Sequence, residues 1–279
     1  MAAPTASCTL HSPLLAGIGV PHAFSTRHGG VSTGPFASLN FGNPGDLPDE
    51  RRDPRANIAR NWEILRRAID RAAPSTRGAS ERTVAEVHQI HGNLVSVLRK
   101  GEPSERSPAG GDPKADALVT DDPSRLVAVR VADCTPVLIS SGDGSIVAAV
   151  HAGWRGTVSN IVAVAVRAMS GLGARPSSMR AAIGPCIGPD AFEVGPDVAG
   201  EFRAGFGAAT PHVRAGAAAG KSLVDLKGVL CEQLVAAGLH ASSVDVLPHC
   251  TVRDAADFFS HRRERGLTGR MVGVIGPRG

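Results

Sequence analysis

The chain has 279 residues, of which 42% are hydrophobic and 20% charged, so it is long enough to bury a core as one large domain or two small ones. Its formal net charge of +4 suits an anionic small substrate. The chain has only 4% aromatic residues and no basic arm, so its composition is not typical of a nucleic-acid-binding protein.

The amino-terminal stretch MAAPTASCTLHSPLLAG has neither a basic region followed by a long apolar run nor the length of a membrane helix. We expect residues 1–20 to form a loosely ordered segment. Five cysteines form an odd, widely spaced set, which is typical of a reducing compartment rather than a disulfide framework. The sequence therefore predicts a cytoplasmic protein that is not bound to a membrane.

Helical and strand patterns alternate along the chain without an evident linker or internal repeat. The first helix is predicted from Asp53, where a capping residue and Pro54 precede an apolar pattern of helical spacing. Two further helices ending at glycine are predicted over 157–173 and 222–239. Short segments rich in valine and isoleucine predict strands within 82–98, 125–140, 145–153, 178–184, 242–248 and 269–276. The chain is thus a mixed α and β protein.

Two segments rich in glycine, proline, serine and charge interrupt these patterns, STRGASER at 75–82 and GEPSERSPAGGDPK at 101–114. Neither has apolar residues to pack against a core, so we expect solvated loops, and an active-site lid is the alternative.

Polar residues lie where three predicted strands end or are interrupted. His91 precedes a glycine in VHQIHG, Cys134 follows Asp133 in VRVADCTPVLIS, and His151 ends the strand in AAVHAGWRGT. His88 would point to the opposite face of the strand from His91. Neighbouring strands could therefore bring His91, Cys134 and His151 together.

Such a trio fits two chemistries. Two histidines and a cysteine can hold zinc with the fourth position open, as in catalytic zinc sites. Alternatively, Cys134 is a nucleophile whose base is a histidine. A third interpretation is structural, in which Cys134 is a small buried side chain and the histidines bond only to the backbone.

The stretch HAGWRGT adds a positive turn beside His151. We expect Thr157 to cap the following helix, so that free backbone N–H groups and the Arg155 guanidinium attract an anion, phosphate above all. The alternative is an ordinary strand-to-helix turn in which Arg155 is a surface ion-pair partner.

Seven segments carry a resemblance that extends from about residue 24 to residue 276. They are FSTRHGGVS, QIHG, ADALVT, ADCTPVLI, HAGWRGT, AAIGPCIGPDAFEVG and DFFSHRRERGLTGRM. The chain closely resembles the laccase-like family of multicopper polyphenol oxidases, also called the YfiH or DUF152 family. The resemblance implies a single α/β domain, residues 1–279, with packed mixed β-sheets flanked by helices in α-β-β-α layers. A bacterial deamidating toxin domain with a Cys/His pair is distantly similar in fold.

The resemblance also implies a site and activities. Its zinc ligands correspond to His91, Cys134 and His151, and its activities are phosphorolysis of adenosine, inosine and methylthioadenosine, with deamination of adenosine. Copper-dependent phenol oxidation and editing of peptidoglycan precursors are the other assignments in the family. His261 stands where the family usually has tyrosine, and GPDAFEVG lacks a cysteine that many members carry, so substrate preference stays open.

Chemistry decides among these assignments. Multicopper oxidases use several His-x-His pairs, and the ten histidines here include none. The cytidine-deaminase pattern of H-x-E with P-C-x-x-C is also missing. We therefore expect a zinc-dependent purine nucleoside phosphorylase with an adenosine deaminase side activity. The first alternative is a Cys/His amide hydrolase that edits peptidoglycan precursors, and a copper-dependent oxidase comes last.

The expected partners are a purine nucleoside and phosphate, with one zinc per chain and copper as the lesser possibility, in a monomer or small homo-oligomer. Cys134, His151 and Asp133 are the candidate catalytic residues, and Asp116 is a second candidate proton carrier. The candidate substrate-binding residues are Arg27, Asn40, Arg155 and Arg262, the last with Arg263 beside it. For each, a purely structural role is the alternative: Arg27 and Asn40 in shaping a turn, Asp116 in capping a strand, Arg262 and Arg263 on a solvated helix.

Overall fold

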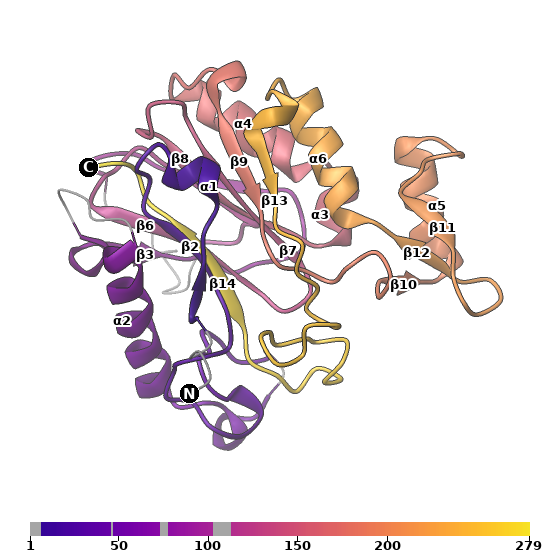
Figure 1. Cartoon of the computed structure of the whole chain (residues 1–279), viewed down its shortest axis with the longest axis horizontal. Coiled ribbons are helices and arrows are strands. Elements are labelled where there is room, and N and C mark those ends of the chain that lie inside the picture. Colours follow the sequence, from indigo (N-terminus) through magenta and orange to yellow (C-terminus); the bar gives the residue numbers. More distant parts are fainter. Residues whose placement is uncertain (1–6, 46, 73–77, 103–112) are drawn as a thin grey trace, which may run out of the picture.

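The computed structural model describes the chain except residues 1–6, 46, 73–77 and 103–112. Two β-sheets pack face to face, and helices cover their outer faces (Figure 1). This arrangement confirms the predicted single α/β domain with α-β-β-α layers.

The first sheet has five strands in the order β1-β2-β14-β6-β3. They are β1 (Thr9–Leu10), β2 (His22–Ser25), β3 (Thr83–Ala85), β6 (Arg125–Val131) and β14 (Met271–Ile275). The long helix α2 (Arg55–Ala72) covers the outer face, and its buried Leu65 and Ile69 pack with Ala128 and Val272 of the sheet. The helix predicted from Asp53 is thus confirmed, beginning two residues later.

The second sheet has six strands in the order β13-β9-β7-β8-β5-β4. They are β4 (Val95–Leu98), β5 (Ala117–Thr120), β7 (Thr135–Ser140), β8 (Val147–Ala152), β9 (Arg180–Ile183) and β13 (Val244–Val246). The central strands β7 and β8 are buried along their whole length because both faces are covered. Uninterrupted apolar runs such as TPVLIS are the sequence signature of that burial.

Alternate residues of these strands serve two different cores. Val137 packs toward helices α4 (Ile161–Gly171) and α6 (Leu226–Ala236) on the outer face. The next residue, Leu138, packs toward the five-stranded sheet. His151 lies on the same face of β8 as Ala149, so it points to the space between the sheets.

A small lobe lies at one side of the molecule (Figure 1). It combines a three-stranded sheet with one helix around Phe192, Phe202 and Val229. Its elements are β10 (Glu193–Val194), β11 (Val213–Ala215), β12 (Ser222–Val224) and α5 (Pro196–Phe206). The sequence patterns did not predict this lobe, and residues 222–224, expected to begin a helix, form β12 instead.

The remaining elements are short. They are helices α1 (Pro13–Ala16) and α3 (Trp154–Val158) and the 3-10 helices η1 (Gly34–Phe36), η2 (Asp49–Arg51), η3 (Ala79–Glu81), η4 (Pro176–Ser178) and η5 (Ala241–Ser243). The helix predicted over 157–173 is two helices, because Asn160 adopts a left-handed conformation between α3 and α4.

Two expectations about loose segments need correction. Of the first 20 residues, 7–20 are described, and they include β1 on the edge of the first sheet and α1 with a fully buried Leu15. Within the expected loop 75–82, Ala79 and Arg82 are buried, and the Arg82 guanidinium donates to the carbonyl of Pro277. Residues 73–77 and most of the 101–114 segment lie outside the described residues.

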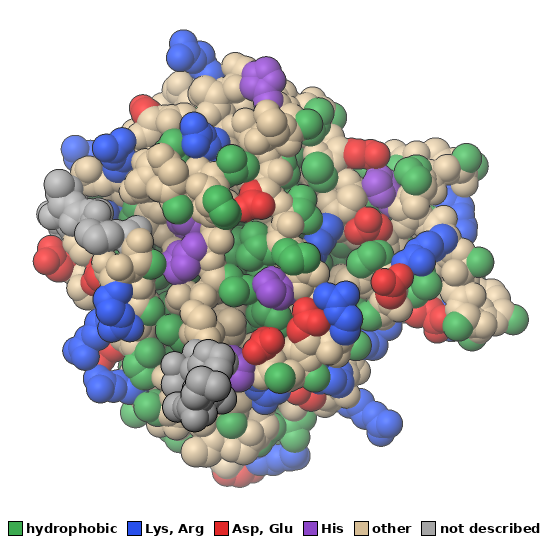
Figure 2. All heavy atoms as spheres, in the orientation of Figure 1, with side chains coloured by type: hydrophobic (Ala, Val, Ile, Leu, Met, Phe, Trp, Pro, Cys, Tyr) green, Lys and Arg blue, Asp and Glu red, His purple; other side chains and the backbone are tan. Residues whose placement is uncertain are grey.

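Positive and negative side chains alternate over the face shown in Figure 2, without a continuous basic stripe. No helix in the described part of the chain is long and apolar enough to cross a membrane.

Candidate functional site

The three predicted ligands come together where the chain passes between the two sheets. His91 lies in the connection from β3 of the first sheet to β4 of the second, and Cys134 lies in the connection from β6 to β7. His151 is the penultimate residue of strand β8, directly opposite Pro136 of β7. The strand expected over 82–98 is therefore two strands in different sheets, joined by the loop that carries His91.

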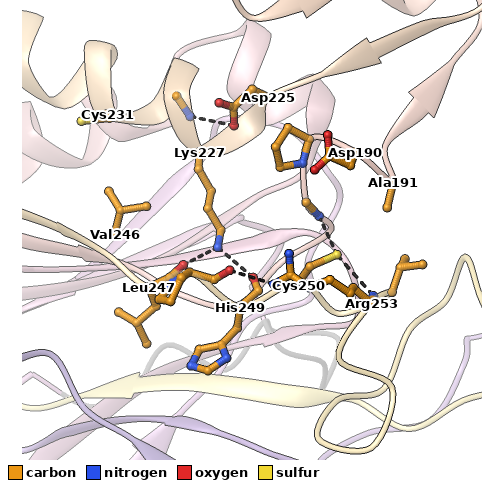
Figure 3. A pocket seen from close by; sticks show the side chains of 15 residues that line it. Asp190, Ala191, Asp225, Lys227, Cys231, Val246, Leu247, His249, Cys250 and Arg253 are labelled. Carbon is orange, nitrogen blue, oxygen red and sulfur yellow. Dashed lines mark hydrogen bonds between the residues drawn. The ribbon is translucent and has the colours of Figure 1, made fainter. Parts of the chain in front are cut away.

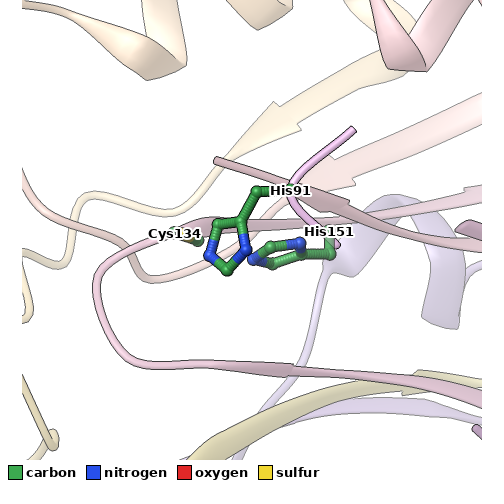
Figure 4. A group of neighbouring side chains, drawn as sticks. All are labelled: His91, Cys134 and His151. Atoms are coloured by element: carbon green, nitrogen blue, oxygen red, sulfur yellow. The ribbon is translucent and has the colours of Figure 1, made fainter. Parts of the chain in front are cut away.

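The ligand atoms of His91, Cys134 and His151 all lie within 4.8 Å of one another. The two imidazole rings meet edge to face with 4.9 Å between their centroids. Figure 4 shows the three side chains directed toward one another. His151 is buried while His91 is exposed, so the cluster is open to solvent on the side of His91.

Asp116 holds both histidines in place from behind the cluster. Its carboxylate accepts from His151 Nδ1 at 2.8 Å, and from the backbone N–H groups of His91 at 2.8 Å and Gly92 at 2.7 Å. This arrangement leaves His151 Nε2 directed to the cluster. Fixing an imidazole through its other nitrogen is the usual outer-shell arrangement around a metal-binding histidine.

The backbone is unusual at two positions of the cluster. His91 has φ 59° and Asp133 has φ 91°, in the left-handed region that residues other than glycine seldom occupy. For His91 the Asp116 carboxylate compensates by accepting from the adjacent amides. Strained conformations of this kind persist where the surrounding structure fixes them, often at functional sites.

The charges of the cluster favour a cysteine thiolate. Burial raises the pKa of Cys134, but the imidazoles of His151 and His91 outweigh burial and lower it to about 6. Burial lowers the pKa of His151, but Cys134 and the Asp116 carboxylate outweigh it and raise that pKa to about 9. Near neutral pH, Cys134 is therefore a thiolate, which is the form that binds metals and attacks electrophiles.

Asp133, predicted as a catalytic acid or base, makes contacts on both carboxylate oxygens. Oδ1 accepts from the hydroxyl of Thr251 at 2.6 Å, and Oδ2 accepts from the backbone N–H of Arg262 at 2.7 Å. Its carbonyl accepts from Ile187 at 2.9 Å. Asp133 thus joins three segments next to Cys134. Thr251 was missed by the sequence analysis because its segment HCTVRD has no strand or helix periodicity.

The turn after His151 begins a helix earlier than expected. Helix α3 starts at Trp154 with Gly153 as its N-cap, and Thr157 lies inside the helix, where its hydroxyl donates to the Gly153 carbonyl. The prediction that Thr157 caps this helix is therefore wrong. Trp154 packs against the core of the small lobe, which explains why a tryptophan is needed here.

Arg155 is exposed, and its guanidinium stacks over the Trp154 ring at 4.4 Å. Within the described residues no carboxylate lies within ion-pair distance of it, so the ion-pair interpretation of Arg155 has no partner there.

The other candidate substrate residues have structural partners. Asn40 is fully buried, donates to Asp53 and accepts from Gly42 and Arg270, so its side chain is not accessible to a substrate. Arg27 donates to the carbonyl of Ala37 and pairs with Glu264.

The two arginines of the SHRRERG segment differ from each other. Arg263 donates to three backbone carbonyls and to Glu264, which makes it a brace of this loop. Arg262 is exposed, and its guanidinium donates to the carbonyl of Glu193 at 3.0 Å. Because its backbone N–H binds Asp133, Arg262 is tied directly to the residue before Cys134.

The donor set fits a metal ion of the borderline class. Two imidazole nitrogens and one thiolate suit zinc, and a three-residue site leaves a fourth position for water or substrate. Gly153 supports this interpretation, since a Cβ there would lie 3.2 Å from both Cys134 Sγ and His91 Cδ2. A Cβ at this distance would crowd two of the three candidate ligands. The cluster is therefore compatible with a metal.

The chain is similar to known proteins along almost its whole length. A family model described as multi-copper polyphenol oxidoreductase laccase matches residues 21–278. A protein of Deinococcus radiodurans named purine nucleoside phosphorylase is 40% identical over 268 residues, which cover 96% of this chain and 92% of that protein. The purine nucleoside phosphorylase Cgl2154/cg2365 of Corynebacterium glutamicum is 37% identical over 259 residues, covering 92% and 94%.

Solved structures show the same fold. The crystal structure of YlmD from Geobacillus stearothermophilus has a TM-score of 0.81 at 33% identity, with 99% of this chain and 98% of that chain covered. The DUF152 protein NMB0706 of Neisseria meningitidis has a TM-score of 0.79 at 34% identity, with 98% and 100% covered. With a family model that spans almost the whole chain and relatives of this similarity, the chain belongs to the laccase-like DUF152/YfiH family, whose relatives at this level of identity are named purine nucleoside phosphorylases.

Proposed function

We propose that this chain is a zinc-dependent purine nucleoside phosphorylase that acts on adenosine, inosine and methylthioadenosine, with adenosine deamination as a side activity. The observation that carries the proposal is the cluster of His91, Cys134 and His151, held from behind by Asp116. The names of relatives that are 35–40% identical support the reaction class.

In this proposal His91, Cys134 and His151 hold one zinc per chain. When bound, zinc supplies a Lewis acid that can polarise a purine or activate a water. Asp116 keeps His151 Nε2 directed to the site. Asp133 is a positioning residue, because both of its carboxylate oxygens already accept hydrogen bonds from neighbouring segments.

Metal analysis tests the ligand set. The wild type is expected to carry about one zinc per chain, and Cys134→Ala is expected to lose most of it because zinc favours a thiolate ligand. Cys231→Ala is the matched control, since Cys231 lies on α6 outside the cluster. A Cys134→Ala protein that is as zinc-loaded as the wild type would remove Cys134 from the site.

Phosphorolysis also needs an anion site for phosphate, and Arg155 is our candidate for it. The residue is exposed, follows His151 by four positions, and has no carboxylate partner among the described residues. Stacking on Trp154 leaves the edge of its guanidinium free to donate paired N–H bonds to an oxyanion.

The test is steady-state inosine phosphorolysis at varied phosphate concentration. Arg155→Ala is expected to raise the KM for phosphate about tenfold or more, as expected for loss of a charge-assisted contact, while zinc content and Tm stay near wild type. Arg155→Lys should recover only part of the loss, because an ammonium cannot make the paired contacts. Unchanged phosphate dependence in Arg155→Ala would exclude this role.

One observation favours a second function, a Cys/His amide hydrolase of the kind that edits peptidoglycan precursors. Cys134, His151 and Asp116 also have the order of a nucleophile, its base and the group that orients the base. The two functions respond differently to phosphate, chelators and thiol alkylation. Phosphate-independent base release, together with chelator-resistant turnover of an amide substrate, would favour the hydrolase.

A third, non-enzymatic alternative is a metal-dependent binding module, which would bind nucleosides tightly without turnover.

Multicopper oxidation is the weakest candidate. The sequence has no His-x-His pair, and within the described residues only one group of three metal-binding side chains is found, which is too few for a type 1 centre plus a trinuclear cluster.

A further inference from the structure

A cavity of about 620 Å³ lies between the start of α6 and the segment that follows β13 (Figure 3). Its volume falls within the range of roughly 300–1,000 Å³ that is typical of small-molecule sites. None of the three residues of the His–Cys–His cluster lines it. The cavity is therefore a separate feature of the molecule.

The walls of this cavity are mostly apolar. Pro189, Val246, Leu247, Pro248 and Val252 supply aliphatic surface. Val246 is 41% exposed although it is a large apolar side chain, which places it at the open side of the cavity. A ligand with an apolar body would cover surface that is now in contact with water.

One buried positive charge reaches this cavity. Lys227 lies in the first turn of α6 and is only 9% exposed. Its ammonium donates to the carbonyl of Leu247 and, at 2.8 Å, to the carbonyl of His249. Figure 3 shows the lysine extending from the helix across the cavity to these carbonyls.

In the described part of the chain, this ammonium has no carboxylate within ion-pair distance. Among the described residues, none of the ion pairs within 4.0 Å includes Lys227. Two carboxylates line the cavity, but Asp225 accepts from the backbone N–H of Gly228 as the N-cap of α6, and Asp190 pairs with Arg214. An ammonium group has three N–H donors, and its burial is less costly when an opposite charge accompanies it than when only neutral acceptors do.

We propose that this cavity is a binding site for a small organic anion of single charge with an apolar body. Its carboxylate or sulfonate group accepts the remaining N–H of Lys227, and its body packs on Val246, Leu247 and Val252. The lining holds Asp190 and Asp225 against Lys227 and Arg253, and Arg253 is already paired with Asp254, so the cavity disfavours a ligand of higher charge such as a phosphate dianion.

Two segments that line this cavity also hydrogen-bond to Asp133, the residue before Cys134. Cys250 lines the cavity, and the next residue, Thr251, donates to Asp133 beside Cys134. In the segment between β9 and β10, Gly188 lines the cavity and the backbone N–H of Ile187 donates to the carbonyl of Asp133. An anion bound here would therefore contact the segments that position Cys134.

Two fluorescent probes of the same shape test the proposal on the full chain. Anilinonaphthalenesulfonate carries one negative charge, and N-phenylnaphthylamine is its neutral counterpart. The wild type is expected to bind the anionic probe at one saturable site. Lys227→Met should weaken the anionic probe about tenfold or more, since a charge-assisted hydrogen bond is lost, and leave the neutral probe nearly unchanged.

Two further variants make the test independent of the folding of Lys227→Met. Val246→Trp fills the open side of the cavity and should weaken both probes, while the exposed Lys221→Met should weaken neither. Equal binding of the anionic probe by wild type, Lys227→Met and Val246→Trp would overturn the proposal. Displacement of the anionic probe by inorganic phosphate but not by benzoate would overturn it too, because the site would then select a phosphate.

Discussion

At the scale of single residues, the carboxylate of Asp116 stabilises the His–Cys–His cluster. Burial raises the pKa of Asp116, but the hydrogen bonds from His151 and the backbone N–H of Gly92 outweigh burial and keep that pKa below its usual range. The charged carboxylate then fixes both the orientation of the His151 ring and the turn of His91. A residue outside the ligand set thus decides the geometry of two ligands.

A second buried residue, His22, gives a prediction about pH. It accepts from the Ser12 N–H at 2.9 Å and contacts the Val20 carbonyl at 2.8 Å, which requires the neutral ring. Burial is the main reason that its pKa falls from 6.5 to about 4. As the pH falls, His22 therefore takes up a proton in the unfolded chain at a higher pH than in the folded chain. The free energy of unfolding decreases between pH 6.5 and 4 for this reason, by about 2 kcal/mol at pH 5.

Urea denaturation at pH 7.5 and pH 5 measures this decrease. In His22→Gln, the part of the decrease in unfolding free energy that is due to His22 should disappear. His240 is exposed, so His240→Gln should show the same pH dependence as the wild type. A His22→Gln protein with the full wild-type pH dependence would contradict the assignment.

At the scale of elements, the short helix α3 links the small lobe to the His–Cys–His cluster. Trp154 packs into the lobe, and Gly156 faces the loop of His91, where a Cβ would approach the Gly92 carbonyl to 2.9 Å. Glycine at 156 permits this close approach, and the Asn93 side chain of the loop donates to the Ser159 carbonyl at the end of the helix at 3.2 Å. The helix therefore positions His91 without contacting the ligand atoms.

Gly156→Ala tests this contact. The added methyl group must push the Gly92 carbonyl away, so His91 should shift and zinc affinity should fall about tenfold or more, as for disrupted outer-shell partners. Competition with a chromogenic chelator measures the affinity. Gly171→Ala is the matched control, because a Cβ at that position meets no atom within 4 Å. Equal zinc affinities of the two variants would show that the contact does not matter.

At the scale of the whole molecule, the cluster lies where connections cross between the sheets. His91 and Cys134 come from two such crossings and His151 from the end of β8, so a bound metal would join three segments that are far apart in the sequence. A ligand that binds only the folded chain stabilises it by mass action. Metal binding and global stability should therefore be coupled.

Thermal unfolding with and without a chelator tests that coupling. With free zinc at about 100 times its Kd, the expected stabilisation is about 2.7 kcal/mol, which corresponds to a Tm about 5–10 °C higher for a chain of this size. Cys134→Ala should show almost no difference between zinc and chelator, and Cys231→Ala should show the full difference. A wild-type Tm that does not respond to chelation would contradict a structural link through the metal.

Much of the fold follows from local patterns. Both faces of β6, β7 and β8 are covered, so these strands consist of apolar runs, and the runs at 125–140 and 145–153 predict them. Asp53 with Pro54 predicts the start of α2. The segment 82–98 resembles one strand because valine and isoleucine recur along it, and only the crossing between the sheets divides it into β3 and β4. The small lobe has strands of two or three residues, which are too short for a periodic pattern.

The sequence by itself determined the residue types of the site. Two histidines and a cysteine, each within two residues of a glycine or proline at an interruption or end of an apolar run, can be recognised without a structure. Only the tertiary structure decided how they meet. The pairing of β5 with β8 brings Asp116 opposite His151, and the exchange of the chain between sheets places Cys134 beside them. Strand register and sheet order depend on contacts between distant segments, and a local pattern carries no information about those contacts.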